Sequence, residues 1–242
     1  MRLVLLHGFT QSTAVWDGVR RHLLDGVHAR GVEVLTPEVP DDLSFAATAR
    51  AVVETAGEAI YCGYSMGGRL CMRGAFDRPD LVRGLVLVSA SPGIADDAER
   101  AARARQDDAL ASEVRTIGVE AFLRRWLAQP LFSALEGGDE EVARRARCTS
   151  VERLEHQLAA LGQGAQESLW HRLPELEMPL AVVTGLSDPK YDAIGDAIAA
   201  VIPQCVRVRL PGSHALPLEQ PQALAAAVLD MVRRVAVHGR TS

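Results

Sequence analysis

Short apolar runs alternate along both ends of the chain with longer stretches in which apolar residues recur at helical spacing. A continuous run of about four apolar residues is typical of a strand that is buried on both faces of a parallel sheet. The expected strands are 3–6, 32–35, 59–62, 85–88, 180–184 and 205–210. The expected helices between and after them are 14–24, 44–55, 66–76, 191–201 and 219–237. This alternation predicts a mostly parallel, doubly wound α/β sheet.

The last expected strand has a different pattern from the others. Arg207 and Arg209 alternate there with Val206, Val208 and Leu210. Strict alternation indicates one buried and one exposed face, so this strand is expected at an edge of the sheet.

The middle of the chain lacks strand-like runs. Residues 94–172 are rich in Ala, Arg, Glu and Asp at helical spacing. This pattern predicts a helical insertion. With 242 residues, the chain suits one large α/β core. We therefore expect a core of 1–93 and 173–242, with 94–172 as a helical cap over the C-terminal edge of the sheet.

Composition narrows the class of protein. Hydrophobic residues make up 48% and charged residues 24% of the chain, values typical of soluble globular proteins. No apolar run approaches the roughly 20 residues that cross a bilayer, and the first residues do not resemble a signal peptide. A net charge of −5 disfavours a nucleic-acid surface. We expect a cytoplasmic protein without nucleic-acid or membrane partners, either a monomer or a small homo-oligomer.

The cysteines do not indicate a metal site. Cys62, Cys71, Cys148 and Cys205 show neither a CxxC motif nor the spacing of zinc ligands. They are expected to be buried thiols rather than disulfides or metal ligands.

The pentapeptide 63–67 fits the Gly-x-Ser-x-Gly nucleophile elbow, with Ser65 at its centre. In that elbow a strand turns sharply into a helix and leaves the serine hydroxyl exposed. An ordinary glycine-rich turn would show the same short pattern. A serine needs a base to remove its proton, and the base needs an acid to orient it. The elbow therefore predicts a histidine and an acid later in the chain.

Two later residues fit these roles. Asp188 follows the expected strand 180–184, and His214 follows the expected strand 205–210. The carboxyl ends of parallel strands meet at the edge where open α/β sheets hold their sites, and the order Ser, Asp, His is that of α/β-hydrolases. Asp188 alone could be only a helix cap before Pro189, and His214 alone only a loop histidine. Together with Ser65 they favour a catalytic triad.

Backbone amides are the expected oxyanion donors. In the His-Gly-Phe turn after the first strand, the N–H of Phe9 is one candidate, and the N–H of Met66 after the serine is the other. His7 itself is expected to be structural.

Arg69 is the candidate for binding an anion. It lies four residues after Ser65, so both side chains can share one face of the helix, and a guanidinium there suits a carboxylate. Most arginines of 94–172 are read as members of a solvated, salt-bridged helix face.

Several segments together resemble one branch of the α/β-hydrolase superfamily, the 2-succinyl-6-hydroxy-2,4-cyclohexadiene-1-carboxylate (SHCHC) synthases of menaquinone biosynthesis. The elbow and the His-Gly turn are common to many esterases. The Glu-Arg-x-x-Arg motif from residue 99, the Trp-x-x-Gln-Pro-x-Phe motif from residue 126, the segment 164–170 and the Asp-x-Lys-Tyr motif from residue 188 are more selective.

The resemblance implies an α/β-hydrolase fold and a lyase without cofactor or metal. Such an enzyme eliminates pyruvate from 2-succinyl-5-enolpyruvyl-6-hydroxy-3-cyclohexene-1-carboxylate, a polycarboxylate, with the serine of the triad acting as a base. By motif position it implies these substrate contacts: Arg69, Arg103 and Arg147 for carboxylates, Tyr64 and Trp126 as walls, and Lys190 as a further cation.

Two alternatives remain open from the sequence. A carboxylesterase or a C–C-bond hydrolase could use the same triad, because fold does not fix function. A non-catalytic ligand receptor on this fold would not need an activated serine. The arginine set favours the synthase, since unpaired cations are costly in a pocket for neutral esters.

Overall fold

Six strands form a single parallel sheet in the computed structural model, which describes residues 1–28 and 31–238. The strands are β1 (Arg2–Leu6), β2 (Glu33–Leu35), β3 (Ala59–Tyr64), β4 (Val82–Val88), β5 (Leu180–Gly185) and β6 (Val206–Leu210). Their order is β2-β1-β3-β4-β5-β6, and every neighbouring pair is parallel. The doubly wound α/β prediction is confirmed. The order reverses between β1 and β3, which is where such sheets bind ligands.

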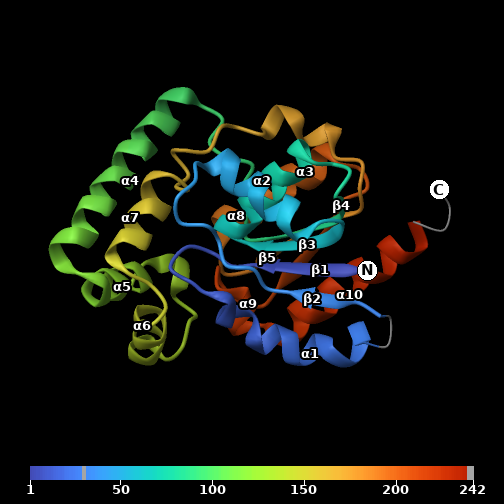
Figure 1. The fold of residues 1–242 in the computed structure, drawn as a ribbon, viewed down its shortest axis with the longest axis horizontal. Helices are drawn as coiled ribbons and strands as arrows, with labels where there is room; N and C mark the ends of the chain where they lie inside the picture. The colour runs from blue at the N-terminus through green and yellow to red at the C-terminus, as the bar shows by residue number, and fades with distance from the viewer. Residues whose placement is uncertain (29–30, 239–242) are drawn as a thin grey trace.

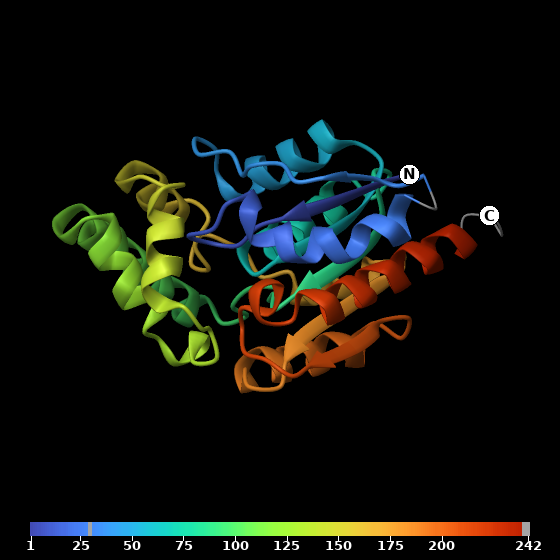
Figure 2. The same ribbon diagram turned by 90° about the horizontal axis from the view of Figure 1, so that it is seen from below.

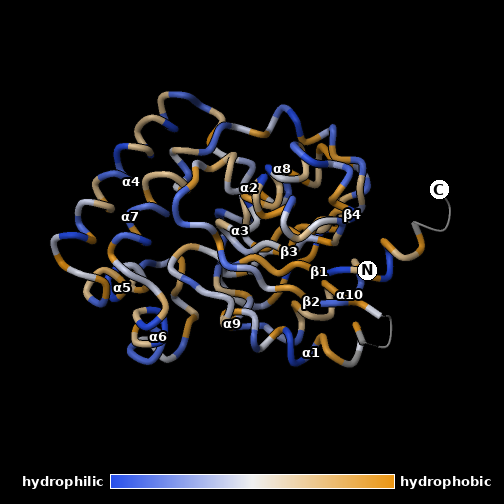
Figure 3. Tube along the Cα trace, in the orientation of Figure 1, coloured by the Kyte–Doolittle hydropathy of each residue, from blue (hydrophilic) through white to orange (hydrophobic). Residues whose placement is uncertain are grey.

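Helices cover both faces of the sheet (Figure 1). One face carries α2 (Phe45–Ala56), α3 (Met66–Asp77) and α8 (Pro189–Val201), and the other carries α1 (Asp17–His28) and α10 (Pro221–His238). Successive strand residues point to opposite faces, so Leu6 joins the core under α3 while Leu5 joins the core under α10. Hydrophobic residues are concentrated in the sheet in Figure 3, as expected for strands buried on both sides.

The insertion between β4 and β5 is helical. It contains α4 (Asp97–Ile117), α5 (Val119–Leu127), η2 (Pro130–Phe132), α6 (Gly138–Ala146), α7 (Val151–Ala159) and the start of η3 (Trp170–Glu175). Helices α4 to α7 lie together beyond one end of the sheet, on the side away from the two chain termini (Figures 1 and 2). Helices α4, α5 and α7 share a small apolar core that includes Val114, Phe122 and Leu154. We call α4 to α7 the cap.

The chain rejoins the core before the expected boundary at residue 172. Leu161 and Leu169 already belong to the core under α3, and Trp170 Nε1 donates to the carbonyl of Gly93 at 2.9 Å. The short helix η3 spans the expected boundary, so its first residues pack with the core rather than with the cap.

Two helix ends differ from the expectations. The first helix begins as a single 3-10 turn, η1 (Thr13–Trp16), before α1 continues to His28. The helix expected over 219–237 is divided into α9 (Leu216–Glu219) and α10. Pro221 lacks an N–H and disfavours helical geometry in the residue before it, so one helix ends there and another begins.

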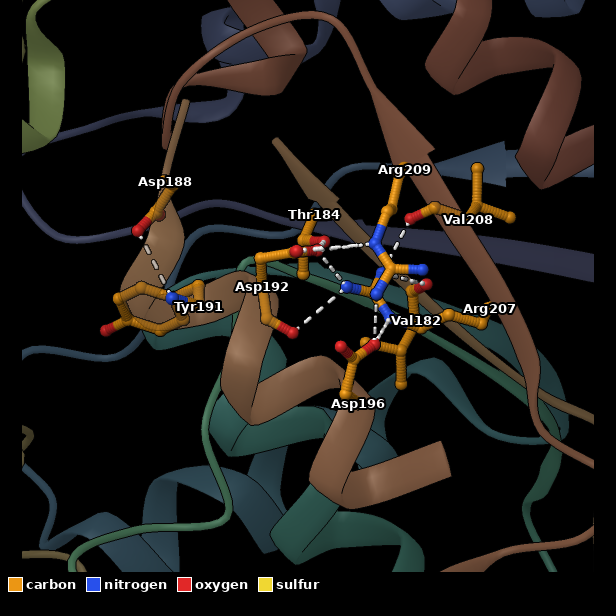
Figure 4. A network of polar contacts seen from close by, with 9 residues as sticks. All are labelled: Val182, Thr184, Asp188, Tyr191, Asp192, Asp196, Arg207, Val208 and Arg209. Carbon is orange, nitrogen blue, oxygen red and sulfur yellow. Dashed lines mark hydrogen bonds and ion pairs between the residues drawn. The ribbon is translucent and has the colours of Figure 1, made fainter. Parts of the chain in front are cut away.

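The two arginines of edge strand β6 pair with acids of α8, although the side chain of Arg209 is still 39% exposed (Figure 4). Arg207 and Arg209 both pair with Asp192 and Asp196, and the side chain of Arg207 is only 13% exposed. Gly195 is required beneath this network, because an added Cβ would lie 2.8 Å from the guanidinium carbon of Arg207. The network holds α8 against β6, and the first turn of α8 lies just past the carboxyl end of β5.

The expectation of buried thiols holds for Cys62 and Cys71 only. Cys205 is partly exposed and Cys148 is exposed.

Within the part of the chain that the structure describes, no helix is both long and apolar enough to cross a bilayer.

Candidate active site

Ser65 lies at the sharp turn between β3 and α3. Its backbone has φ 51° and ψ −111°, a conformation that costs free energy in any residue with a side chain. Close backbone approach accounts for the neighbouring glycines. A Cβ on Gly67 would lie 2.3 Å from the carbonyl oxygen of Leu6, and one on Gly63 would lie 2.4 Å from that of Gly67. The turn therefore matches the elbow that the sequence predicts.

The structure brings the three predicted triad residues together. His214 Nε2 lies 3.0 Å from Ser65 Oγ, and His214 Nδ1 lies 2.8 Å from Asp188 Oδ2. Asp188 and His214 are 3% and 2% exposed. A neutral imidazole with its proton on Nδ1 donates to the carboxylate and leaves a lone pair for the serine proton. This arrangement can activate the serine oxygen as a base or as a nucleophile.

Asp188 also caps α8, so its carboxylate makes both the helix-cap contact and the contact with His214. Its Oδ1 accepts from the backbone N–H of Tyr191 at 3.2 Å, while Oδ2 faces His214. The Tyr191 ring packs on the imidazole with centroids 4.5 Å apart.

Glu219 holds the loop of His214, a contact that sequence reasoning missed. Its carboxylate accepts from both the backbone N–H and the Oγ of Ser213, each at 2.5 Å. The nearest sequence signal is only that Glu219 lies five residues past the histidine, on the short helix α9.

The two predicted oxyanion donors line the same cavity as Ser65. Among residues 1–28 and 31–238, neither the Phe9 nor the Met66 backbone N–H donates to a protein acceptor. Both amides are thus available to a ligand oxygen. His7 is fully buried but not part of the cavity wall, and its Nδ1 lies 2.9 Å from the carbonyl of Gly8.

A cavity of about 270 Å³ lies between the triad and the cap. Five of the six predicted substrate contacts line it: Tyr64, Arg69, Arg103, Trp126 and Lys190. Trp126 forms an aromatic wall with Phe9 and Phe132, at centroid distances of 4.9 and 6.3 Å. Burial raises the pKa of Tyr64, so this phenol stays protonated in the wall.

Arg69 is a buried cation without a carboxylate partner in the described chain. Its guanidinium donates to the carbonyls of Leu161 (2.7 Å) and Gly162 (3.3 Å) and to Oε1 of Gln166 (3.0 Å). Burial lowers its pKa to about 10, which still leaves it charged at neutral pH. The side chain therefore joins α3 to the segment after the cap and leaves a positive charge uncompensated beside the serine.

Arg103 already has a partner. Its Nε donates to Asp107 Oδ1 at 2.8 Å, and Asp107 Oδ2 accepts from the N–H of Gly164 at 3.1 Å. Asp107 is 2% exposed, so its charge and that of Arg103 largely compensate each other.

Arg147 does not reach the cavity. It is the exposed C-cap of α6, and it is absent from the cavity wall. Its neighbour Arg145 points inward instead, since residues two apart lie on nearly opposite sides of a helix. Arg145 is 1% exposed, donates to Glu141 at 2.6 Å and to the hydroxyl of Thr10 at 2.5 Å, and has one buried nitrogen without a partner.

Comparison with known proteins shows to which protein family the chain belongs. The model of the alpha/beta hydrolase family matches residues 3–227, and the chain belongs to this family.

Three relatives place it within the family. A candidate SHCHC synthase from Bacillus subtilis (strain 168) is 29% identical, over 96% of this chain and 90% of its own. The SHCHC synthase of Serratia proteamaculans (strain 568) is 30% identical, over 79% of this chain and 74% of its own. The structure of MenH from S. aureus superposes with a TM-score of 0.88 at 24% identity, over 98% and 94% of the two chains. Within the alpha/beta hydrolases the chain is an enzyme of the SHCHC synthase group.

Proposed function

We propose that this enzyme eliminates pyruvate from 2-succinyl-5-enolpyruvyl-6-hydroxy-3-cyclohexene-1-carboxylate and forms SHCHC, a step of menaquinone biosynthesis in the cytoplasm. The names of the relatives support this reaction class. The observation that carries the proposal is Arg69, which is 5% exposed in the wall of the serine cavity with no carboxylate partner among the described residues. An uncompensated buried cation is costly unless an anionic ligand pairs with it.

In the proposed mechanism Ser65 is a base rather than a nucleophile. His214, held by Asp188, takes the serine proton, and the serine oxygen then removes a proton from the ring of the substrate. The released electron pair forms a double bond to the neighbouring ring carbon, the existing ring double bond shifts by one position, and the C–O bond to the enolpyruvyl group breaks. Enolpyruvate leaves as its enolate, takes up at carbon the proton that His214 took from Ser65, and becomes pyruvate. Ser65 keeps the proton from the ring, so the triad returns to its initial state.

The backbone amides of Phe9 and Met66 donate hydrogen bonds to the negative charge that develops during proton removal. We assign the succinyl carbonyl oxygen to these two donors, because the carbanion next to it delocalises onto that oxygen. No cofactor takes part in this step.

The remaining wall residues bind and orient the substrate. Arg69 and Arg103 face its carboxylates, Tyr64 and Trp126 hold the ring, and Lys190 lies at the rim as a further cation. Arg147 leaves this set, because it is exposed and absent from the cavity wall, and its inward neighbour Arg145 lies 5.8 Å over the ring of Phe132 without lining the cavity itself.

The experiment measures pyruvate release from the enolpyruvyl substrate beside hydrolysis of neutral p-nitrophenyl esters, for the wild type and Arg69→Ala. Removing the guanidinium should cost roughly 2–5 kcal/mol in kcat/KM for the polycarboxylate, because the substrate charge then stays unpaired in the cavity. Neutral esters should lose little. Thermal melts of both proteins separate this loss from unfolding of the segment that Arg69 holds.

Ester or C–C-bond hydrolysis is the competing activity, since the same hydrogen-bonded triad also suits a serine nucleophile. Fast ester turnover by the wild type with no detectable pyruvate release would decide for a hydrolase.

A further inference from the structure

Gln157 is a buried amide without a partner in the wall of the serine cavity. It lies on α7, is 1% exposed and lines the cavity with Ser65. Neither its Oε1 nor its Nε2 forms a hydrogen bond within the described residues. Of the other three glutamines of the wall, Gln129 donates to the carbonyl of Trp126, Gln163 donates to the hydroxyl of Tyr191, and Gln106 is exposed. Gln157 therefore offers an unused donor and an unused acceptor to this cavity.

The helical pattern of α7 would favour an apolar residue at this position. Leu154 lies one turn earlier and Leu158 follows directly, and both are buried in the apolar core of the cap. A buried amide with both polar atoms unpaired lowers the stability of the fold. Solvent cannot relieve this cost, because the amide oxygen and nitrogen are closed off from water in this state. A buried polar group without a hydrogen-bond partner is expected at a functional cavity where a bound ligand supplies that partner.

The chemistry of the amide selects the ligand group. A carboxylate only accepts hydrogen bonds, so it would satisfy Nε2 and leave Oε1 unpaired. A hydroxyl accepts from Nε2 and donates to Oε1, and it satisfies both atoms. A carboxylate can pair its charge with Arg69 in the same cavity, whereas a hydroxyl carries no charge that would compensate the guanidinium. The amide is therefore matched to a hydroxyl group.

We propose that Gln157 binds the ring hydroxyl of the substrate and sets specificity for it. This inference rests on the proposed function, in which SHCHC carries one hydroxyl on its ring. Rotation about the side-chain bonds of Gln157 turns its amide from the wall into the cavity when the ligand enters.

The first test replaces Gln157 by Met, which is unbranched and of similar length, and by Leu as a second apolar variant. Both should melt at the same temperature as the wild type or higher, because an unpaired buried amide is removed. Their kcat/KM for pyruvate release should fall roughly 5- to 100-fold, because the substrate hydroxyl is left without a partner. Glu152→Met, on the exposed side of the same helix, is the matched control and should keep wild-type kinetics, with a melting temperature equal to or slightly below that of the wild type because its contact with Ser150 at the helix N-terminus is lost.

The second test measures inhibition by SHCHC and by its analogue without the ring hydroxyl. The wild type should prefer SHCHC by about the factor that Gln157→Met loses in kcat/KM. Gln157→Met should bind the two compounds equally. Unchanged discrimination in this variant, or unchanged kcat/KM, would overturn the inference.

The same data separate this inference from the proposed reaction. If the wild type releases no pyruvate and does not bind SHCHC, the reaction and the assignment of Gln157 fail together. If the wild type releases pyruvate and Gln157→Met does so equally well, only the assignment of Gln157 fails.

Discussion

Asp188 and His214 are joined through one carboxylate oxygen, while the other oxygen of Asp188 is held by the helix that follows. Oδ2 lies 2.8 Å from His214 Nδ1, and Oδ1 accepts from the N–H of Tyr191 at 3.2 Å. The acid is therefore oriented by the first turn of α8, which the pairs of Asp192 with Arg207 and Arg209 fix against β6 (Figure 4). Helix capping and orientation of the histidine use separate atoms, so the two roles can be separated by mutation.

Asp188→Asn should remove the catalytic role and keep the structural one. An Asn oxygen can still accept from Tyr191, so the melting temperature should change little. Without the carboxylate the imidazole loses its preferred tautomer, and kcat for pyruvate release should fall roughly 10³- to 10⁴-fold. Asp188→Ala is the comparison, because it removes the cap as well and should cost about 1 kcal/mol of stability. Wild-type turnover in the Asn variant would argue against a triad.

The strands and the elbow could be predicted because their causes are local in sequence. A strand buried on both faces needs a continuous apolar run, and Leu3 to Leu6 and Leu85 to Val88 have one. The elbow needs small residues where backbones touch, and Gly63 and Gly67 show this in the sequence itself.

The partners of the buried polar groups could not be predicted, because they depend on segments distant in the chain. Arg69 donates to residues about 90 positions later, and Arg145 of the cap donates to Thr10 of the core. Sequence spacing does not reveal which of two arginines on α6 turns inward, and motif position suggested Arg147. An unpartnered group such as Gln157 is visible only once every neighbour has been placed.

Ser65→Gly should be more stable than Ser65→Ala although both are inactive. The backbone of Ser65, with φ 51° and ψ −111°, is strained for Ala but open to Gly. The relief of strain should outweigh the greater conformational entropy that Gly has in the unfolded chain. We expect the free energy of unfolding of Ser65→Gly to exceed that of Ser65→Ala by about 1 kcal/mol. Urea denaturation of the two variants measures it, and because both lack the hydroxyl, the lost hydrogen bond to His214 cancels. Equal midpoints would mean that the turn stores no strain.

Arg145→Ala and Arg147→Ala form a matched pair on one helix. Removing Arg145 breaks its pair with Glu141 and its contact with Thr10, while Glu141 keeps Arg144 as a partner, so the free energy of unfolding should fall by about 1–3 kcal/mol. Arg147 is exposed, and its removal should change stability by less than about 0.5 kcal/mol. Urea denaturation of both variants gives these values. A larger effect at Arg147 than at Arg145 would contradict the inward placement of Arg145.

Glu38 connects the cap to the core and should make this connection dependent on pH. Its carboxylate lies 2.8 Å from Nη2 of Arg153, on α7, and 3.2 Å from Nε2 of His7. The contact with His7, together with the charge of Arg153, lowers the pKa of Glu38 from 4.5 to about 2 although burial opposes this shift. Protonation of Glu38 therefore weakens these contacts of the folded state and lowers the free energy of unfolding.

The direction of the pH effect follows from the lowered pKa. The stability that Glu38 contributes is fully present above pH 5 and is lost as the pH falls from about 5 towards 2. The difference in urea midpoint between wild type and Glu38→Gln should thus be constant between pH 7 and 5 and shrink at pH 4 and 3. Because the side chain is 50% exposed, added salt should reduce the difference. In an Arg153→Met background the dependence on pH should become shallower, since the cation of the cap that pairs with Glu38 is gone. A difference that grows as the pH falls would reverse the sign of the shift and remove Glu38 as an anionic link between cap and core.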